Sequence, residues 1–151
     1  MPLPLLPLVI LVAAQPPFAV DRKPMPRGED WGRLLPVQVG PYRRENLKPP
    51  TRDQDGQARY TGLGQSFFLL FGKARDAKDL GAILATVEKE SRALPGQLLE
   101  EKIDLKASTP FLLRVERRGV FFAWARGVYY FSVETEARKP ELQSFLNQFP
   151  Y

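Results

Sequence analysis

Two Arg-Gly pairs in the C-terminal half of the chain constrain the fold more than any other feature of the sequence. Arg118-Gly119 and Arg126-Gly127 interrupt a segment rich in the aromatic and β-branched residues that are typical of strands. Glycine suits two-residue hairpin turns because it adopts positive φ angles at little cost. The spacing therefore predicts a three-stranded antiparallel meander, with strands over 111–117, 120–125 and 128–134.

The same turns predict which side chains share a face of the meander, because side chains alternate along a strand. Centring the turns on the Arg-Gly pairs places Leu113 opposite Trp124 and Phe122 opposite Phe131. A slip of one residue would expose the whole apolar face, so the assignment of faces should be firm. The predicted core face consists of Leu113, Val115, Val120, Phe122, Trp124, Tyr129, Phe131 and Val133.

The opposite face of the meander is the candidate interaction surface. Phe121 and Tyr130 are expected as diagonal neighbours around Ala123, with Arg114 beside them. An aromatic floor with one cation can hold a peptide, a sugar ring or a lipid headgroup. A helix lying over this face would instead make it a second core layer, and the sequence leaves both interpretations open. The candidate surface residues are Arg114, Phe121, Ala123, Val128 and Tyr130.

Two amphipathic helices are predicted outside the meander, over 76–94 and 140–149. Asp76 can cap the first helix, and Pro140 suits the first turn of the second. Each segment carries an apolar stripe at helical spacing, which predicts packing against the sheet. The stripes are Leu80, Ile83, Leu84 and Val87 in the first segment, and Leu142, Phe145, Leu146 and Phe149 in the second.

Further strands are predicted over 57–61, 65–74 and 100–106. The 65–74 run is apolar on both faces, which indicates a central strand, and the alternating charges of 100–106 indicate an edge strand. The order β-β-α-β-β-β-β-α is that of an α+β fold, an antiparallel sheet of about five to six strands packed by two helices. This order resembles the α-β-α sandwiches of the Mog1/PsbP type, and the resemblance implies the layered fold alone, without a function or a site.

The N-terminus predicts export. Residues 1–14 fit a signal peptide, in which an apolar run ends at the small residues Val12-Ala13-Ala14 that a signal peptidase would recognise. An apolar helix of roughly twelve residues is too short to cross a hydrocarbon core about 30 Å thick. The alternative is an apolar tail on a cytosolic protein. We expect a secreted or periplasmic protein with no transmembrane span after processing.

The mature chain is predicted to comprise a Pro-rich basic linker over 15–30 and a single α+β domain over 31–151. The density of proline up to residue 50 favours extended backbone over helix. Residues 31–39 are apolar enough to dock on the domain. The expected contacts are Trp31, Leu34, Leu35, Val37 and Val39.

The net charge of +5 is concentrated near the N-terminus, because residues 21–52 hold eight basic and four acidic side chains. A basic chain can indicate a nucleic-acid ligand. An exported protein would instead meet anionic envelope surfaces, so no nucleic-acid partner is predicted. The simpler alternative is a solvated linker that carries a basic excess.

The absence of cysteine and histidine excludes the commonest catalytic and metal sites. The chain can build no disulfide, thiol nucleophile, histidine triad or ordinary zinc site. Asp53-Gln54-Asp55-Gly56 fits a turn better than a calcium loop. Glu100, Glu101 and Asp104 alternate with lysines, which favours a solvated strand edge over a catalytic carboxylate pair. We therefore predict no catalytic residue, no cofactor and no metal.

The leading functional hypothesis is a non-catalytic exported domain that binds a protein or a cell-envelope component. The second is a binder of a small apolar or amphipathic ligand between helix and sheet, and the third is a carboxylate-only hydrolase. A small-ligand binder should enclose an apolar cavity of about 300 Å³ or more. A protein binder should instead present Phe121, Ala123 and Tyr130 on an accessible surface.

Overall fold

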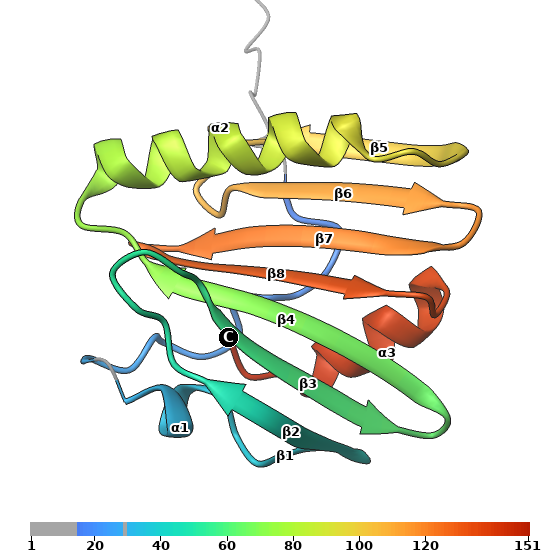
Figure 1. Ribbon diagram of the computed structural model, residues 1–151, viewed down its shortest axis with the longest axis horizontal. Coiled ribbons are helices and arrows are strands. Elements are labelled where there is room, and N and C mark those ends of the chain that lie inside the picture. The colour runs from blue at the N-terminus through green and yellow to red at the C-terminus, as the bar shows by residue number, and fades with distance from the viewer. Residues whose placement is uncertain (1–14, 29) are drawn as a thin grey trace, which may run out of the picture.

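One open antiparallel sheet organises the part of the chain that the structure, a computed structural model, describes: residues 15–28 and 30–151. Within these residues the sheet has eight strands in the order β1-β2-β3-β4-β8-β7-β6-β5, accompanied by three helices (Figure 1). The predicted α+β class is confirmed, but the sheet has more strands than the five or six expected. The predicted signal peptide, residues 1–14, lies outside the described residues.

The predicted meander is present with a different register. Leu113 lies opposite Phe122, and Trp124 lies opposite Phe131, so each hairpin is offset by two residues from the prediction. Because side chains repeat every two residues along a strand, this offset leaves every side chain that remains in a strand on its predicted face. The strands are β6 (Phe111–Glu116), β7 (Gly119–Arg126) and β8 (Tyr129–Thr135).

The two glycines of the Arg-Gly pairs serve different purposes. Gly127 occupies the first position of its two-residue turn, where its φ of +59° is the left-handed conformation that favours glycine. Gly119 instead begins β7, where a Cβ would lie 2.4 Å from the carbonyl oxygen of Thr135. The first turn is formed by Arg117 and Arg118, so the prediction that Gly119 is a turn centre is wrong. Gly119 is required by a close approach of backbones.

The other predicted elements are found with small shifts at their ends. β4 lies between β3 and β8, as expected of a central strand, and β5 forms one edge of the sheet. The side chain of Asp76 caps α2 by accepting a hydrogen bond of 2.8 Å from the backbone N–H of Asp79. The elements are β3 (Gly56–Gly62), β4 (Gln65–Lys73), α2 (Ala77–Ala93), β5 (Leu98–Asp104) and α3 (Lys139–Gln148).

Two strands that the sequence analysis did not predict extend the other edge of the sheet. They are β1 (Gln38–Val39) and β2 (Tyr42–Lys48), which lie among the prolines of the segment expected to be extended coil. β2 is largely exposed and polar, so it lacks the alternating apolar pattern that marks a strand. Its pairing with β3 supplies the strand geometry, with an irregularity after Glu45.

The face of the sheet that α3 covers, called the α3 face below, holds an aromatic core. Phe145 of α3 stacks on Phe67 of β4 with ring centroids 4.6 Å apart. Phe149, which follows α3, meets the rings of Trp124 and Phe131 edge-on. The eight predicted core-face residues all belong to this cluster, with Val115 as a partly buried member, so the face assignment is confirmed.

The N-terminal segment, residues 15–28, helps to cover the α3 face, although the sequence analysis assigned 15–30 to a linker. Phe18 and Val20 are buried, and the ring of Phe18 meets that of Phe122 edge-on at 4.9 Å. Arg126 donates hydrogen bonds of 3.0 and 2.9 Å to the carbonyl oxygens of Val20 and Lys23. Extended backbone in this stretch is thus held against the sheet by side chains more than a hundred residues away in sequence.

A short helix, α1 (Trp31–Leu34), follows the N-terminal segment and docks on the same core. Trp31, Leu34, Leu35 and Val39 are buried, as the docking prediction requires. Val37 is 55% exposed, so its predicted contact is wrong. It lies at a bend in the chain immediately before β1.

The opposite face, called the α2 face below, is only partly covered. The buried cluster between α2 and the sheet is small and consists of Ala74, Leu80, Leu84 and Ala125. In Figure 1, α2 runs along the β5 end of the sheet, and no helix lies in front of β3 or β4. The α2 face is therefore the side of the sheet on which a surface remains open.

Candidate binding site

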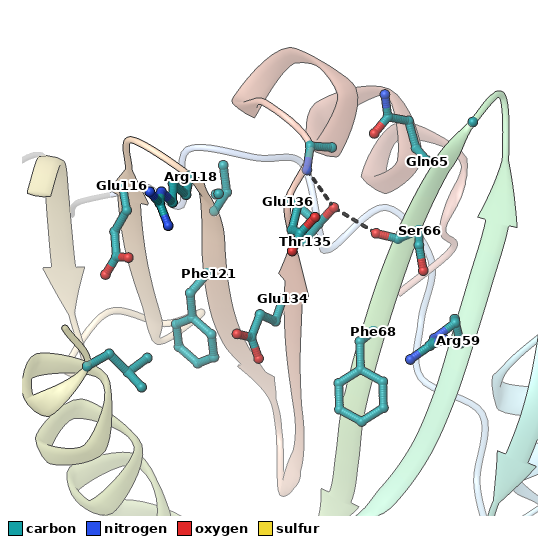
Figure 2. A pocket seen from close by; sticks show the side chains of 15 residues that line it. Arg59, Gln65, Ser66, Phe68, Glu116, Arg118, Phe121, Glu134, Thr135 and Glu136 are labelled. Atoms are coloured by element: carbon teal, nitrogen blue, oxygen red, sulfur yellow. Dashed lines mark hydrogen bonds between the residues drawn. The ribbon is translucent and has the colours of Figure 1, made fainter. Parts of the chain in front are cut away.

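Two of the hollows on the α2 face adjoin each other near the C-terminal end of α2. The first, called the α2 groove, is an apolar cleft of about 190 Å³ between α2 and strands β4, β7 and β8. The second, called the hairpin basin, is a more polar depression of about 660 Å³ beside the β6–β7 hairpin (Figure 2). Leu94 and Phe121 line both hollows and make them one continuous surface.

A row of side chains from adjacent strands crosses the floor of the hairpin basin. Phe121 of β7 lies opposite Glu134 of β8, and Glu134 lies opposite Phe68 of β4. Arg59 of β3 follows, opposite Phe68. Figure 2 shows the carboxylate of Glu134 between the rings of Phe121 and Phe68, with Arg59 beyond Phe68. Opposed side chains in a sheet have Cβ atoms only about 4.5–5.5 Å apart, so the four groups form one continuous row.

The charged members of this row are open to solvent. Glu134 and Arg59 are exposed, while Phe121 and Phe68 are half-buried. Within the described part of the chain, the side chains of Glu134 and Arg59 form no hydrogen bond or ion pair. The row thus combines two rings held by the sheet with charges that are available to a ligand.

Three of the five predicted surface residues meet in the α2 groove. Phe121, Ala123 and Tyr130 line it together, facing Leu84 and Val87 of α2. Ala123 is buried at the floor, whereas Phe121 and Tyr130 keep part of their rings exposed. Both interpretations of this face therefore hold in part, because α2 covers some of it and leaves a cleft over the rest.

Arg114 does not belong to this open surface. Its guanidinium is buried and pairs with Glu116 at 2.7 Å and with Glu101 at 3.5 Å. Arg114 is therefore a structural cation that links β6 to the edge strand, and the prediction that it stands free beside the aromatic floor is wrong. The exposed cation of the row is Arg59, on the far side of Phe68.

Val128 lies apart from the groove, in the turn between β7 and β8, where it packs against the margins of both cores. The prediction places it at the start of a strand on the candidate surface. The two-residue offset of the hairpin moves it into the turn instead, at the end of the sheet remote from the hairpin basin. Val128 is thus excluded from the candidate site.

Tyr130 is fixed at the other end of the α2 groove. Its hydroxyl donates a hydrogen bond of 2.6 Å to a carboxylate oxygen of Asp55, and its ring lies across Gly72 of β4. Burial, and then the hydrogen bond to Asp55, raise the pKa of Tyr130 above the ordinary tyrosine value. The side chain therefore remains a neutral donor, and its position depends on the missing Cβ of Gly72.

The part of the site that lies outside the meander was not predicted from the sequence. Phe68 and Arg59 belong to strands whose pairing with the meander is non-local, and Leu94 ends the helical segment. A signal existed in β4, whose apolar residues on both faces required cover on the second face as well. Nothing local indicated that β8, and not β5 or β6, would be its partner.

Two of the three carboxylates considered for catalysis, Glu100 and Glu101, are engaged in ion pairs. Both oxygens of Glu100 accept from the ammonium group of Lys139, at 3.0 and 3.1 Å. The hydrogen bond from Lys139 lowers the pKa of Glu100, opposite to the shift that a general acid needs. Glu101 contacts Arg114 and Arg92. These groups therefore fit an ion-pair network at the β5 edge.

The remaining parts of the described chain contribute neither metal ligands nor a membrane helix. In residues 15–28 and 30–151, carboxylates do not gather in groups of three or more that could hold a metal ion. The helices within the same residues are too short or too polar to cross a membrane. Comparison with known proteins adds no relative to this geometry: no protein-family model, no curated protein and no solved structure matches the chain.

Proposed function

We propose that this protein is a non-catalytic binding domain that holds an amphipathic segment of a partner protein on the α2 face. The observation that carries the proposal is the α2 groove, an apolar cleft that opens directly into the polar hairpin basin. Such a surface suits a chain that inserts an apolar side chain at one point and lays polar groups beside it.

The dimensions favour a protein segment over a small ligand. Pockets for small molecules have volumes of about 300–1,000 Å³ and enclose most of the ligand. The α2 groove has a volume of about 190 Å³ and is partly open to solvent. It can therefore accommodate one side chain, while the rest of the bound segment stays outside. The hairpin basin, at about 660 Å³, falls within that range of volumes, but it is open to solvent and more polar than apolar, which suits the flank of a larger partner.

The non-catalytic character is supported by the state of the carboxylates. Glu100 and Glu101 have cationic partners within 4 Å, and the pKa of Glu100 is lowered. Acid–base catalysis on a glycoside needs one carboxyl group with a raised pKa facing a second. A binding function requires neither.

The proposal also includes export of the protein and a layered fold of the Mog1/PsbP type. The apolar sequence 1–14 supports cleavage before Gln15, and mass spectrometry of the protein recovered outside the cytosol tests it, with an intact Met1 as the contrary result. The helices on both faces of the antiparallel sheet support the layered arrangement of the Mog1/PsbP type. That likeness brings no ligand with it.

A groove-filling substitution tests the binding function directly. Ser132→Leu places a larger side chain in the α2 groove, and a library of defined twelve-residue peptides serves as the probe. We expect the wild type to select peptides with a large aliphatic residue and the variant to bind them at least about tenfold more weakly, the effect of about 1.4 kcal/mol. Circular dichroism and thermal melting establish that Ser132→Leu is folded.

Thr61→Leu is the matched control for this experiment. Thr61 is a half-exposed residue on the α2 face of β3, outside both hollows, so the substitution adds the same apolar group away from the groove. It should select the same peptides as the wild type. Equal binding by wild type and Ser132→Leu would overturn the groove as the site, as would the absence of any selected peptide.

A further inference from the structure

We propose that the hairpin basin binds the cationic end of a lysine or arginine side chain of the partner, held on Glu134 between the rings of Phe68 and Phe121. This inference rests on the proposed function and names the chemistry that its ligand must carry. Glu134 is the central residue of this proposed site, because its cross-strand neighbours on both sides are phenylalanines.

Cross-strand pairing does not account for a charged residue at Glu134. A cross-strand pair stabilises a sheet when its side chains carry opposite charges, or when an aromatic side chain meets a β-branched one. Glu134 faces two phenylalanines and forms neither kind of pair. Its side chain makes no ion pair or hydrogen bond with any residue in the described part of the chain. The carboxylate instead stands exposed between two half-buried rings (Figure 2).

The combination of a carboxylate and two ring faces is selective for organic cations. An ammonium or guanidinium group gains from the negative face of an aromatic ring as well as from the carboxylate. An anion is repelled by Glu134, and a neutral side chain gains only ring contact. Arg59 lies on the outer side of Phe68 and limits the row to one cation, because a second would meet like charge there.

The strand geometry also gives the spacing of the partner's residues. Ser132 lines the α2 groove, and Glu134 follows two residues later on the same face of β8. Two residues along a strand advance about 6.8 Å, at 3.4 Å per residue. An extended partner therefore reaches both hollows with a large aliphatic residue at position i and a lysine or arginine at i+2 or i−2.

Three capped hexapeptides that differ at one position test the inference. Each carries leucine and, two residues later, lysine, arginine or norleucine, the uncharged counterpart of lysine; a second set has the reverse order. Binding is followed by amide chemical shifts in ¹⁵N-labelled full-length protein. In one of the two orders, we expect both cationic peptides to bind about five- to tenfold more tightly than the norleucine peptide, the sum of a cation–π contact and an exposed ion pair.

Substitutions separate this inference from the proposed function. Glu134→Gln should reduce the preference for the cation to the share that the ring contact supplies, about threefold or less, and Phe68→Leu should reduce the preference about threefold. Glu136→Gln is the matched control, because Glu136 is an exposed carboxylate of the same basin that does not lie between the two rings. It should keep the preference.

Two contrary results have distinct meanings. Equal affinity for all three peptides, with binding still lost in Ser132→Leu, would overturn the cation site and leave the groove intact. Absence of binding by every peptide would count against both the cation site and the proposed function. A preference of undiminished size in Glu134→Gln would also overturn the role of this carboxylate.

Discussion

Phe121 and Phe122 are consecutive residues of β7, and they show how differently the two faces of the sheet are used. Phe122 points to the α3 face, where it is fully buried against Phe18 and Trp124. Phe121 points to the α2 face, where it stays half-exposed between a groove and a basin. The same residue type in the same strand thus contributes to the core on one side and to a surface on the other.

The difference follows from what covers each face. The α3 face is closed by α3, by α1 and by the N-terminal segment, and its core is predominantly aromatic. The α2 face has one helix, packed through a few small and aliphatic residues near one end of the strands. We infer that the α3 face supplies most of the stability of the fold, which frees the α2 face for recognition.

The largest expected effect comes from truncating these two neighbours in turn. Phe122→Ala should lower the free energy of unfolding by about 3–5 kcal/mol, since it leaves a cavity in a closed core. Phe121→Ala should cost no more than about 1–2 kcal/mol, because half of the ring is already hydrated and less apolar area is lost. Urea titration measures both, and similar losses would show that the α2 face is as much a core as the α3 face.

A substitution at Gly72 sharpens the comparison on the α2 side. In Gly72→Ala the new Cβ would lie 2.1 Å from the hydroxyl oxygen of Tyr130, so the ring must move and lose its bond to Asp55. We expect a loss of about 1–3 kcal/mol in the free energy of unfolding. An unchanged melting temperature would mean that the ring moves freely and that the groove has no fixed end.

Gly81→Ala is the control for this backbone change. Gly81 lies inside α2, with no atom within 4 Å of the position that a Cβ would take. Alanine has the higher helix propensity, so this variant should gain about 0.5–1 kcal/mol. The two glycine variants are therefore expected to shift the melting temperature in opposite directions.

Arg126→Ala tests how the N-terminal segment is held on the α3 face. The substitution removes the hydrogen bonds to the carbonyl oxygens of Val20 and Lys23. We expect a loss of about 1–2 kcal/mol and faster amide hydrogen exchange confined to the N-terminal segment. Arg118→Ala, at an exposed arginine that lines the hairpin basin, should change the free energy of unfolding by less than about 0.5 kcal/mol. Uniform exchange rates in Arg126→Ala would contradict this anchoring role.

The smallest expected effect concerns the pH dependence at the β5 edge. The pKa of Glu100 is lowered in the folded protein, chiefly by the hydrogen bond from Lys139. The pair therefore stabilises the fold above the unfolded-state pKa of about 4.3, and this contribution is lost as the pH falls through the lowered folded-state pKa. Solvent screening limits it to about 1 kcal/mol or less.

Glu100→Gln makes this contribution measurable. The variant should melt slightly below the wild type at pH 7, and the two melting temperatures should converge in acid. Glu136→Gln, at an exposed glutamate without an ion pair in the described part of the chain, should give a curve parallel to the wild type. A constant gap between Glu100→Gln and the wild type from pH 7 to pH 2 would show that the ion pair is not its cause.

The face assignment in the meander could be predicted because it depends on a local rule. The predicted pairing of Leu113 with Trp124 is wrong by two residues, yet each side chain keeps its face, since an even offset preserves the alternation. Asp76 likewise could be predicted as a cap, because capping involves only the next few residues. Both predictions succeed for the same reason: the interactions that decide them lie within one or two turns of the chain.

The candidate site could be predicted only in part. Phe121, Ala123 and Tyr130 were placed on one face by alternation, but their neighbours Phe68 and Leu84 come from elements far away in sequence. The free cation was assigned to Arg114, whose burial depends on the pairing of β6 with the carboxylates of β5 and with Glu116. Such burial depends on which elements meet, and the local pattern does not contain that information.

From the residues alone follow the α+β class, the two longer helices and the division of the meander into two faces, because periodicity and turn chemistry act over a few residues. Tertiary structure decided that β4 pairs with β8, that a polar proline-flanked segment becomes β2, and that the N-terminal segment closes one face. It also decided that α2 covers its face incompletely. These outcomes depend on which distant segments cover the same apolar surface, and only the complete fold determines which segment does so.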